Sequence, residues 1–315
     1  MKNRSDCGQQ GAQLTKDTEM SMNKRGPAGK SGGAGGSGGG RGGRHGAVDR
    51  SVLTGYELRG GKVSAPARKA APAARPAPQR PTVVWTEAQW LEALPPVLAA
   101  LSDEVAGALS EAQQRQLAAY MVMLAHWNST FNLTALRDAP EMLSHHLSDC
   151  LVVLQPLMRH LREGGWLDRA PAPRLLDVGS GGGLPGVVLA ICCPQVQVTC
   201  VDTVGKKAAF IRQVAAELRL PNLKAEHARV EQLPGRYDLI TSRAFASLVD
   251  FVNLTRQLLG EGAVWMAMKG KTPDEERAEL PADVQVFHVE PLRVPGLDAE
   301  RCLVWMRPAG AQERP

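Results

Sequence analysis

Hydrophobic positions in the first structured part of the chain recur every three or four residues. This spacing is typical of amphipathic helices. Thr86 with Gln89 forms a capping box, which predicts a short helix that Pro95-Pro96 ends. Ser110 with Gln113 predicts a second helix start, and a third helical segment begins after Pro140. The core stripe expected on the second helix is Leu117, Tyr120, Met121, Leu124 and Trp127. We therefore expect an N-terminal helical cap over residues 82–170.

From Arg174 onward, short apolar runs alternate with helical segments. The predicted strands are 175–178, 196–201, 222–226, 237–241, 263–268, 284–289 and 302–306, the last two as a closing antiparallel pair. Three helices are predicted between the strands. The first runs from the Gly-rich turn to Ala190, and the other two cover 205–218 and 248–259. Such alternation predicts an α/β fold with a doubly wound, Rossmann-like parallel sheet over residues 171–315. Right-handed crossovers place the ligand site at the carboxyl ends of the first strands.

Residues 1–81 differ from the rest of the chain in composition. They carry 15 Lys and Arg against 5 Asp and Glu, whereas residues 82–315 carry 22 against 27. The Gly-rich stretch 31–46 and the Ala/Pro/Arg stretch 65–81 bury too little apolar surface to offset chain entropy. We expect a disordered extension. One interpretation is a solvated tail, or an upstream start codon with Met20 or Met22 as a later start of translation. The other is a salt-sensitive arm that contacts RNA.

Several features predict where the protein acts. Apolar runs are interrupted well before the roughly 18 residues of a membrane span, and the N-terminus has no apolar leader segment. The six cysteines include no C-x-x-C pair and no zinc-like spacing. We expect a cytoplasmic monomer without metal or membrane contact. Because residues 82–315 are acidic overall, a nucleic-acid site there must be a local basic patch.

The densest motif is the turn from Asp177 to Gly186, which fits two kinds of ligand. Gly181-x-Gly183-x-x-Gly186 satisfies the dinucleotide pattern, and Asp202 follows at the expected distance. The same turn contains Asp177-x-Gly179-x-Gly181-x-Gly183, a form typical of S-adenosylmethionine sites. In either case glycines let the backbone approach the ligand, and Asp202 accepts the ribose hydroxyls.

Two residues favour the methyltransferase interpretation of this turn. Pro185 removes one of the N–H donors that a pyrophosphate needs at the helix start. The carboxylate of Asp177 suits the cationic methionine end of S-adenosylmethionine and repels a pyrophosphate. A nicotinamide-dependent dehydrogenase remains the alternative.

Further motifs make the resemblance specific. They are Trp127-Asn128 with Phe131-Asn132-Leu133-Thr134; Arg137-Asp138, Glu141-Met142, His146 and Asp149; Arg243-Ala244-Phe245-Ala246-Ser247-Leu248; and Lys269-Gly270. Together with the Gly-rich turn, they make the chain resemble the bacterial small-subunit rRNA (guanine-N7)-methyltransferases, the glucose-inhibited division protein B family. The departures are mild: Cys150 replaces a usual Ser, and Thr203, Lys206 and Lys207 replace the pattern usual after Asp202.

The resemblance implies a class I methyltransferase that uses S-adenosyl-L-methionine to modify N7 of a guanine in 16S rRNA or the small ribosomal subunit. It places cofactor contacts on Gly179, Leu184, Val230-Glu231 and Arg243, and the residues themselves add Asp202. N7 carries a lone pair and no proton, so we expect no catalytic acid or base. Arg243 and Lys269 are expected to position the substrate.

Other residues keep two interpretations each. Lys269 and Lys271 are phosphate contacts or a solvated strand end, and Phe245 stacks on the guanine or packs under its loop. His145 and His146 are interpreted as packing residues, and Trp127, Asn128 and Asn132 as fixing a turn of the cap. Two competing functions also stay open. One is methylation of a small molecule or another RNA nitrogen, and the other is a non-enzymatic Rossmann-like RNA-binding protein.

Overall fold

The structure is a computed structural model, and it describes residues 83–101, 107, 109–245 and 247–310. The extension predicted over residues 1–81 lies outside the described residues, and so does Ala246. Among the described residues, no helix combines the length and the apolar character that crossing a bilayer requires.

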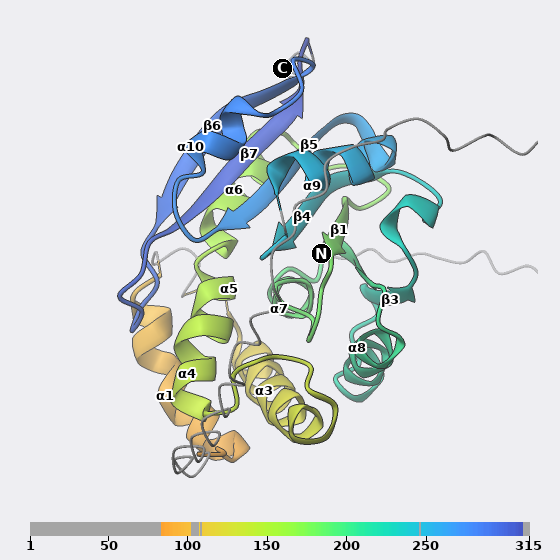
Figure 1. Cartoon of the computed structure of the whole chain (residues 1–315). Coiled ribbons are helices and arrows are strands. Elements are labelled where there is room, and N and C mark those ends of the chain that lie inside the picture. Colours follow the sequence, from red (N-terminus) through yellow and green to blue (C-terminus); the bar gives the residue numbers. More distant parts are fainter. Residues whose placement is uncertain (1–82, 102–106, 108, 246, 311–315) are drawn as a thin grey trace, which may run out of the picture. The chain divides into compact units, whose positions relative to one another are not determined.

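The first part of the described chain is helical. Its elements are α1 (Glu87–Ala99), α3 (Glu111–Phe131), α4 (Ala139–Met142), the π-helix η1 (Leu143–Ser148), α5 (Asp149–Leu151) and α6 (Leu154–Glu163). Both predicted capping boxes are confirmed, at Thr86 and at Ser110. From α4 to α6 the helices follow one another in a nearly continuous column (Figure 1).

One boundary prediction is wrong, because α1 does not end at Pro95-Pro96. Both prolines lie inside the helix, which continues to Ala99. Each proline removes a backbone donor, so the last turn needs stabilisation from elsewhere. Val97 and Leu98 supply it, since both are buried in the same hydrophobic cluster as α3.

Seven strands form one sheet in the order β3-β2-β1-β4-β5-β7-β6. The strands are β1 (Arg174–Val178), β2 (Gln197–Asp202), β3 (Leu223–His227), β4 (Tyr237–Arg243), β5 (Leu259–Lys269), β6 (Val284–Leu292) and β7 (Arg301–Pro308). The first five strands pair in parallel, and β7 is antiparallel to both β5 and β6. The predicted doubly wound α/β sheet and its closing antiparallel pair are therefore confirmed.

Helices connect the strands. They are α7 (Gly186–Cys192), α8 (Gly205–Glu217), the 3-10 turn η2 (Val230–Gln232), α9 (Leu248–Thr255), the 3-10 turn η3 (Arg256–Leu258) and α10 (Asp274–Ala278). The helix predicted over 248–259 is shorter than expected, because its last residues form η3 and the start of β5. The short helix α10, which begins with three acidic residues, was not predicted.

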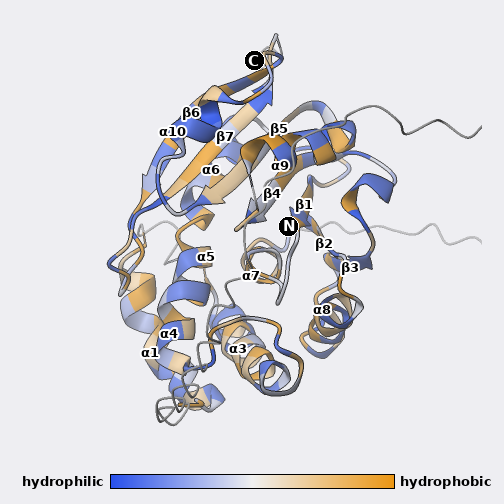
Figure 2. Ribbon diagram, in the orientation of Figure 1, coloured by the Kyte–Doolittle hydropathy of each residue, from blue (hydrophilic) through white to orange (hydrophobic). Residues whose placement is uncertain are grey.

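Successive strand residues point to opposite faces of the sheet and build two hydrophobic clusters. Leu175 and Val198 join the cluster that contains α3 and α7, whereas Leu176 and Ile240 join the cluster of α9. Figure 2 shows β5, β7 and α7 among the most hydrophobic elements.

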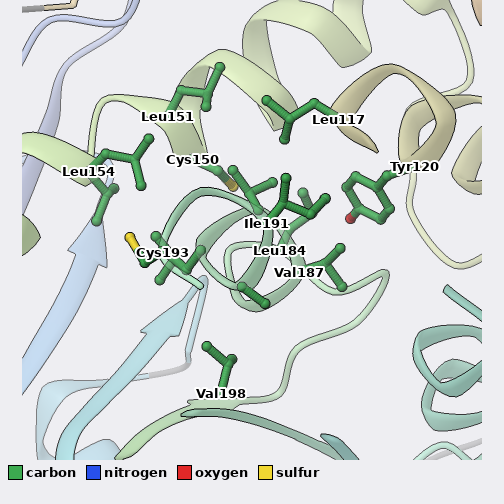
Figure 3. Close-up of a cluster of buried hydrophobic side chains, with 14 of the residues drawn as sticks. Leu117, Tyr120, Cys150, Leu151, Leu154, Leu184, Val187, Ile191, Cys193 and Val198 are labelled. Carbon is green, nitrogen blue, oxygen red and sulfur yellow. The ribbon is translucent and has the colours of Figure 1, made fainter. Parts of the chain in front are cut away.

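The first of these clusters crosses the predicted cap boundary. Leu117, Tyr120 and Leu151 of the helical part lie around Leu184 and Val187 of the sheet part (Figure 3). One continuous core thus binds the helical column to the sheet. The predicted boundary at residue 170, between a helical cap and the sheet domain, therefore stays a prediction.

The strand order also locates the ligand site. The chain leaves β1 toward β2 on one side and later returns to β4 on the other side of β1. At such a reversal the crossovers diverge and leave a crevice at the carboxyl ends of the strands. Here those ends are Val178, Asp202 and Arg243 of β1, β2 and β4.

Candidate functional site at the carboxyl edge of the sheet

The Gly-rich loop after β1 depends on backbone conformations that glycine favours. Gly179, Gly181 and Gly183 have φ angles of 69°, 59° and 89°. These left-handed conformations let the chain turn sharply, and Gly179 N donates to Val201 O of β2 at 2.9 Å. The loop is thus folded back onto the neighbouring strand immediately after β1 ends.

The glycines of this loop serve two different purposes. A Cβ on Gly186 would lie 2.4 Å from Cys200 Sγ, and one on Gly183 would lie 2.3 Å from Val187 Cγ2. These two glycines allow close packing of α7. In contrast, a Cβ on Gly179 would meet nothing within 4 Å, and one on Gly181 only the Gly179 carbonyl at 3.9 Å. The Gly179–Gly181 backbone therefore presents an open face that a ligand can approach.

Asp177, which the sequence predicts beside the cationic end of the cofactor, is turned toward the start of α7. Its side chain is completely buried, and its Oδ2 accepts a hydrogen bond of 2.9 Å from Gly186 N at the start of α7. Burial raises the pKa of this carboxyl to about 6. The protein's own carboxyl thus takes the helix start that a pyrophosphate would need, which argues against a dinucleotide. Its Oδ1 is also buried and has no hydrogen-bond partner among the described residues.

Asp202 ends β2 and shapes the loops on both sides of itself. Its Oδ2 accepts from Gly181 N at 3.0 Å, and its Oδ1 accepts from Val204 N at 2.8 Å. Lys207 Nζ lies 3.5 Å from Oδ2. The carboxylate therefore lies directly beside the open glycine face, where the sequence predicts a ribose.

Three other predicted cofactor contacts differ in exposure. The Leu184 side chain is buried and points into the core, so only its backbone faces the loop (Figure 3). In η2, just after β3, Val230 is buried in the second cluster whereas Glu231 is exposed. Glu231 is thus the more accessible of the two for a polar ligand group.

Arg243 is the last residue of β4 and turns toward the helical column. Its Nη1 donates to His145 O at 2.8 Å and to Asp149 Oδ2 at 3.2 Å. The next residue, Ala244, has a φ of 59°, a left-handed conformation that is costly for a residue with a side chain. The pairing of Asp149 with Arg243 was not predicted from the sequence. The signal that could have indicated it is the motif that contains His146 and Asp149.

The side chains of Lys269 and Phe245 both contact other residues of the protein. Lys269 Nζ at the end of β5 pairs with Glu276 Oε2 of α10 at 2.8 Å, so it is neither a free cation nor a solvated strand end. Phe245 packs on Phe251 with ring centroids 5.6 Å apart. This geometry matches packing under the loop, the second of its two interpretations.

The cap residues have structural contacts of the kind expected. Buried Asn128 donates to Leu136 O at 2.7 Å and accepts from Thr134 N at 2.9 Å. Trp127 packs against Phe131 and against Phe210 of α8. Buried His146 lies 2.5 Å from Thr134 Oγ1. These contacts fix the turn that follows α3.

Fold and site together define a class of protein. The strand order, the antiparallel β7, the open glycine loop after β1 and the carboxylate ending β2 form a class I methyltransferase domain. In the part of the chain that the structure describes, no three His, Cys, Asp or Glu side chains are grouped to hold a metal.

Comparison with known proteins gives the family. Residues 113–304 match the model of the GidB family, described as rRNA small subunit methyltransferase G, and the chain belongs to this family. Two relatives named ribosomal RNA small subunit methyltransferase G come from Acidovorax sp. strain JS42 and Leptothrix cholodnii. They are 60% and 61% identical over 201 residues, which cover 64% of this chain and 89% of each relative. The family makes the protein an S-adenosylmethionine-dependent rRNA methyltransferase, as the resemblance implied.

Solved structures with a weaker likeness include TrmN from Thermus thermophilus and a SAM-dependent methyltransferase from Aquifex aeolicus. The first has a TM-score of 0.40 at 16% identity and covers 72% of this chain and 80% of its own. The second has a TM-score of 0.36 at 16% identity and covers 47% of this chain and 88% of its own.

Proposed function

We propose that the protein transfers a methyl group from S-adenosylmethionine to N7 of a guanine in 16S rRNA. The observation that carries the proposal is the carboxyl edge of the sheet. There the open face of Gly179 and Gly181 follows β1, and the Asp202 carboxylate and the Arg243 guanidinium end the strands on either side of it, β2 and β4. Membership of the rRNA small subunit methyltransferase G family supports the choice of an rRNA substrate.

The residues at this edge fit the cofactor. We propose that the backbone of Gly179 and Leu184 receives its methionine portion, with Asp202 at the ribose and Val230-Glu231 beside the adenine. The open glycine face supports this placement. When bound, the cofactor would supply a methyl group on a cationic sulfur. The lone pair of N7 would form the new N–C bond as the C–S bond breaks in line, and the neutral thioether would leave.

We propose that the chain supplies no general base. N7 of guanine carries no proton, so the protein has only to align N7 with the methyl group. Positioning of this kind can contribute up to roughly 7–11 kcal/mol. Three carboxylates near the edge support the idea, because they already have protein partners: Asp202 the loop amides, Asp149 two arginines and Glu276 both Lys269 and Leu248 N.

The methylated guanine ring becomes cationic, which constrains Arg243. A guanidinium directly against N7 would oppose the reaction. The contacts of Arg243 with the His145 carbonyl and Asp149 hold it from the side of the helical column. We propose that its remaining donors face the cofactor carboxylate, a phosphate or O6. A guanine in a structured rRNA loop would be unstacked to reach this edge.

We further propose that the enzyme acts in the cytoplasm as a monomer without a metal. The test of the function is to map N7-methylguanosine in 16S rRNA by reduction and chain cleavage, in cells with and without this gene. We expect one cleavage site that disappears with the gene. Purified protein that binds S-adenosylmethionine but leaves this site unmethylated would favour the small-molecule or other-nitrogen alternative.

A further inference from the structure

A buried ion cluster joins the helical column to the sheet next to the proposed site. Asp149 is the first residue of α5 and directly follows the π-helix η1. Its Oδ2 lies 3.2 Å from Arg243 Nη1 of β4, and its Oδ1 accepts from Arg301 Nε of β7 at 2.9 Å. The carboxylate therefore links two strands that are separated by β5.

Within the cluster of Asp149, Arg243 and Arg301, positive charges outnumber negative ones. The side chains of Asp149, Arg243 and Arg301 are 4%, 20% and 23% exposed. Their neighbour His146 adds no charge near neutral pH, because burial and then the nearby Arg243 lower its pKa to about 4. Two guanidiniums against one carboxylate leave one net positive charge within the cluster, and the buried Asp177 carboxyl of β1 also acts on Arg243 electrostatically. A partly buried positive charge of this kind favours an anion beside it.

The hydrogen bonds of Arg243 show from which side it is held. Nη1 is used by the His145 carbonyl and by Asp149, and His146 Nδ1 lies 3.4 Å from Nη2. Nε donates to no residue within the described part of the chain. A guanidinium is a rigid plane with five N–H donors. Hydrogen bonds that hold one edge of this plane therefore fix the directions in which the remaining donors point. π-Helices are rare and frequently occur at functional sites, and η1 supplies the His145 carbonyl of this contact.

We propose that Asp149 is a positioning residue: it orients the Arg243 guanidinium so that its free donors face the anionic group bound at the carboxyl edge. This inference rests on the proposed function and deepens it. The anionic group has the chemistry of a carboxylate or phosphate, as carried by the cofactor and by RNA. Asp149 itself touches neither the cofactor nor the guanine, and it acts through Arg243.

The test is a double-mutant cycle in the full-length protein, with Asp149→Asn, Arg243→Ala and the double variant. The readouts are the dissociation constant for S-adenosylmethionine by calorimetry and the rate of single-turnover methylation of unmodified small subunits. Asp149→Asn should slow methylation about 10- to 100-fold, the scale of a misplaced positioning group. In the Arg243→Ala background the same change should cost less than about 2-fold, since the partner is gone.

Two further variants separate positioning from folding. Asp149→Glu keeps the charge and should recover several-fold of the rate lost in Asp149→Asn at an equal melting temperature. Asp283→Asn is the matched control, because it breaks an ion pair with Arg256 in which both side chains are exposed, at 64% and 39%. It should leave methylation unchanged.

The outcomes are distinguishable. An Asp149→Asn loss that persists in full without Arg243 would overturn the proposal, and so would wild-type rates in a folded Asp149→Asn protein. If Asp149→Asn does not fold, Asp149→Ser, which also removes the carboxylate, takes its place in the same cycle. If the wild-type protein neither binds S-adenosylmethionine nor methylates small subunits, the proposed function fails and not the role of Asp149.

Discussion

Two regions of the carboxyl edge are built in contrasting ways. The loop after β1 is local, because nearly all its geometry comes from glycines between residues 179 and 186 and from contacts with the adjacent β2. The cluster around Arg243 is assembled from η1, α5, β4 and β7, with Asp149 and Arg301 separated by 152 residues in the chain. The loop depends on the absence of side chains, whereas the cluster depends on buried charge. Substitutions should therefore affect the two regions in different ways.

The largest expected effect is on the cluster. Arg243→Ala should reduce methylation of small subunits by about 100-fold or more, the scale seen when a preorganised hydrogen-bond donor is removed from an active site. The residual rate, and that of the wild type, should stay flat between about pH 6 and 8, since no base takes part in the chemical step. Single-turnover rates across this range are the measurement.

Arg256→Ala is the control for this prediction, because it removes an arginine from an exposed ion pair with Asp283. Its methylation rate should match the wild type. A bell-shaped profile with a group near neutrality controlling the chemical step would contradict the proposed mechanism.

Substitutions in the loop should separate packing from ligand approach. Gly186→Ala places a Cβ 2.4 Å from Cys200 Sγ and 2.7 Å from Asp177 Oδ2, and should lower the free energy of unfolding by about 1–3 kcal/mol. Gly179→Ala meets open space, and its φ of 69° costs about 1–2 kcal/mol. Only Gly179→Ala should weaken S-adenosylmethionine binding beyond its effect on stability.

Urea unfolding and calorimetric titration of the two variants provide the comparison. Gly270→Ala is a suitable reference for stability, because a Cβ there meets nothing within 4 Å and no left-handed φ is required. Equal losses of cofactor affinity in Gly179→Ala and Gly186→Ala would show that the division of the loop into two faces is wrong.

The two regions should also respond to pH with opposite signs. The pKa of His146 is lowered from 6.5 to about 4 by burial, so its contribution is present above pH 6.5 and is lost as the pH falls through 4. The pKa of Asp177 is raised from 3.8 to about 6, so its contribution is present below pH 3.8 and is lost as the pH rises through 6. Each amounts to roughly 1–3 kcal/mol.

Free energies of unfolding between pH 4 and 7 test these signs in two variants. His146→Gln should reduce the loss of stability toward acid, whereas Asp177→Asn should steepen it. The prediction fails if both variants shift the pH dependence in the same direction.

The smallest expected effect concerns Lys269. We propose that it contacts an rRNA phosphate while it stays paired with Glu276. A plot of log affinity for small subunits against log salt has a negative slope. Lys269→Met should make that slope less steep by about 1. Glu276→Gln, which frees the lysine, should leave the slope unchanged or make it steeper. A salt slope that is identical in Lys269→Met and wild type would remove Lys269 from the RNA contacts.

The fold was largely predictable because its signals are local. Both capping boxes, the alternation of strands and helices and the closing antiparallel pair follow from the spacing of apolar residues, and the structure confirms them. The errors occur where packing outweighs local preference. α1 passes through Pro95-Pro96 because Val97 and Leu98 are buried, and α10 is too short to leave a periodic pattern.

The doubly wound sheet, the Gly-rich loop at its carboxyl edge and the family could be predicted from the sequence, since glycine spacing and motif order are properties of neighbouring residues. Which glycines face open space, and that Asp177 is turned to the start of α7, became visible in the folded structure. It alone brought Asp149 between Arg243 and Arg301. Burial and ion pairing depend on which distant segments come into contact, and no local pattern along the chain specifies those contacts.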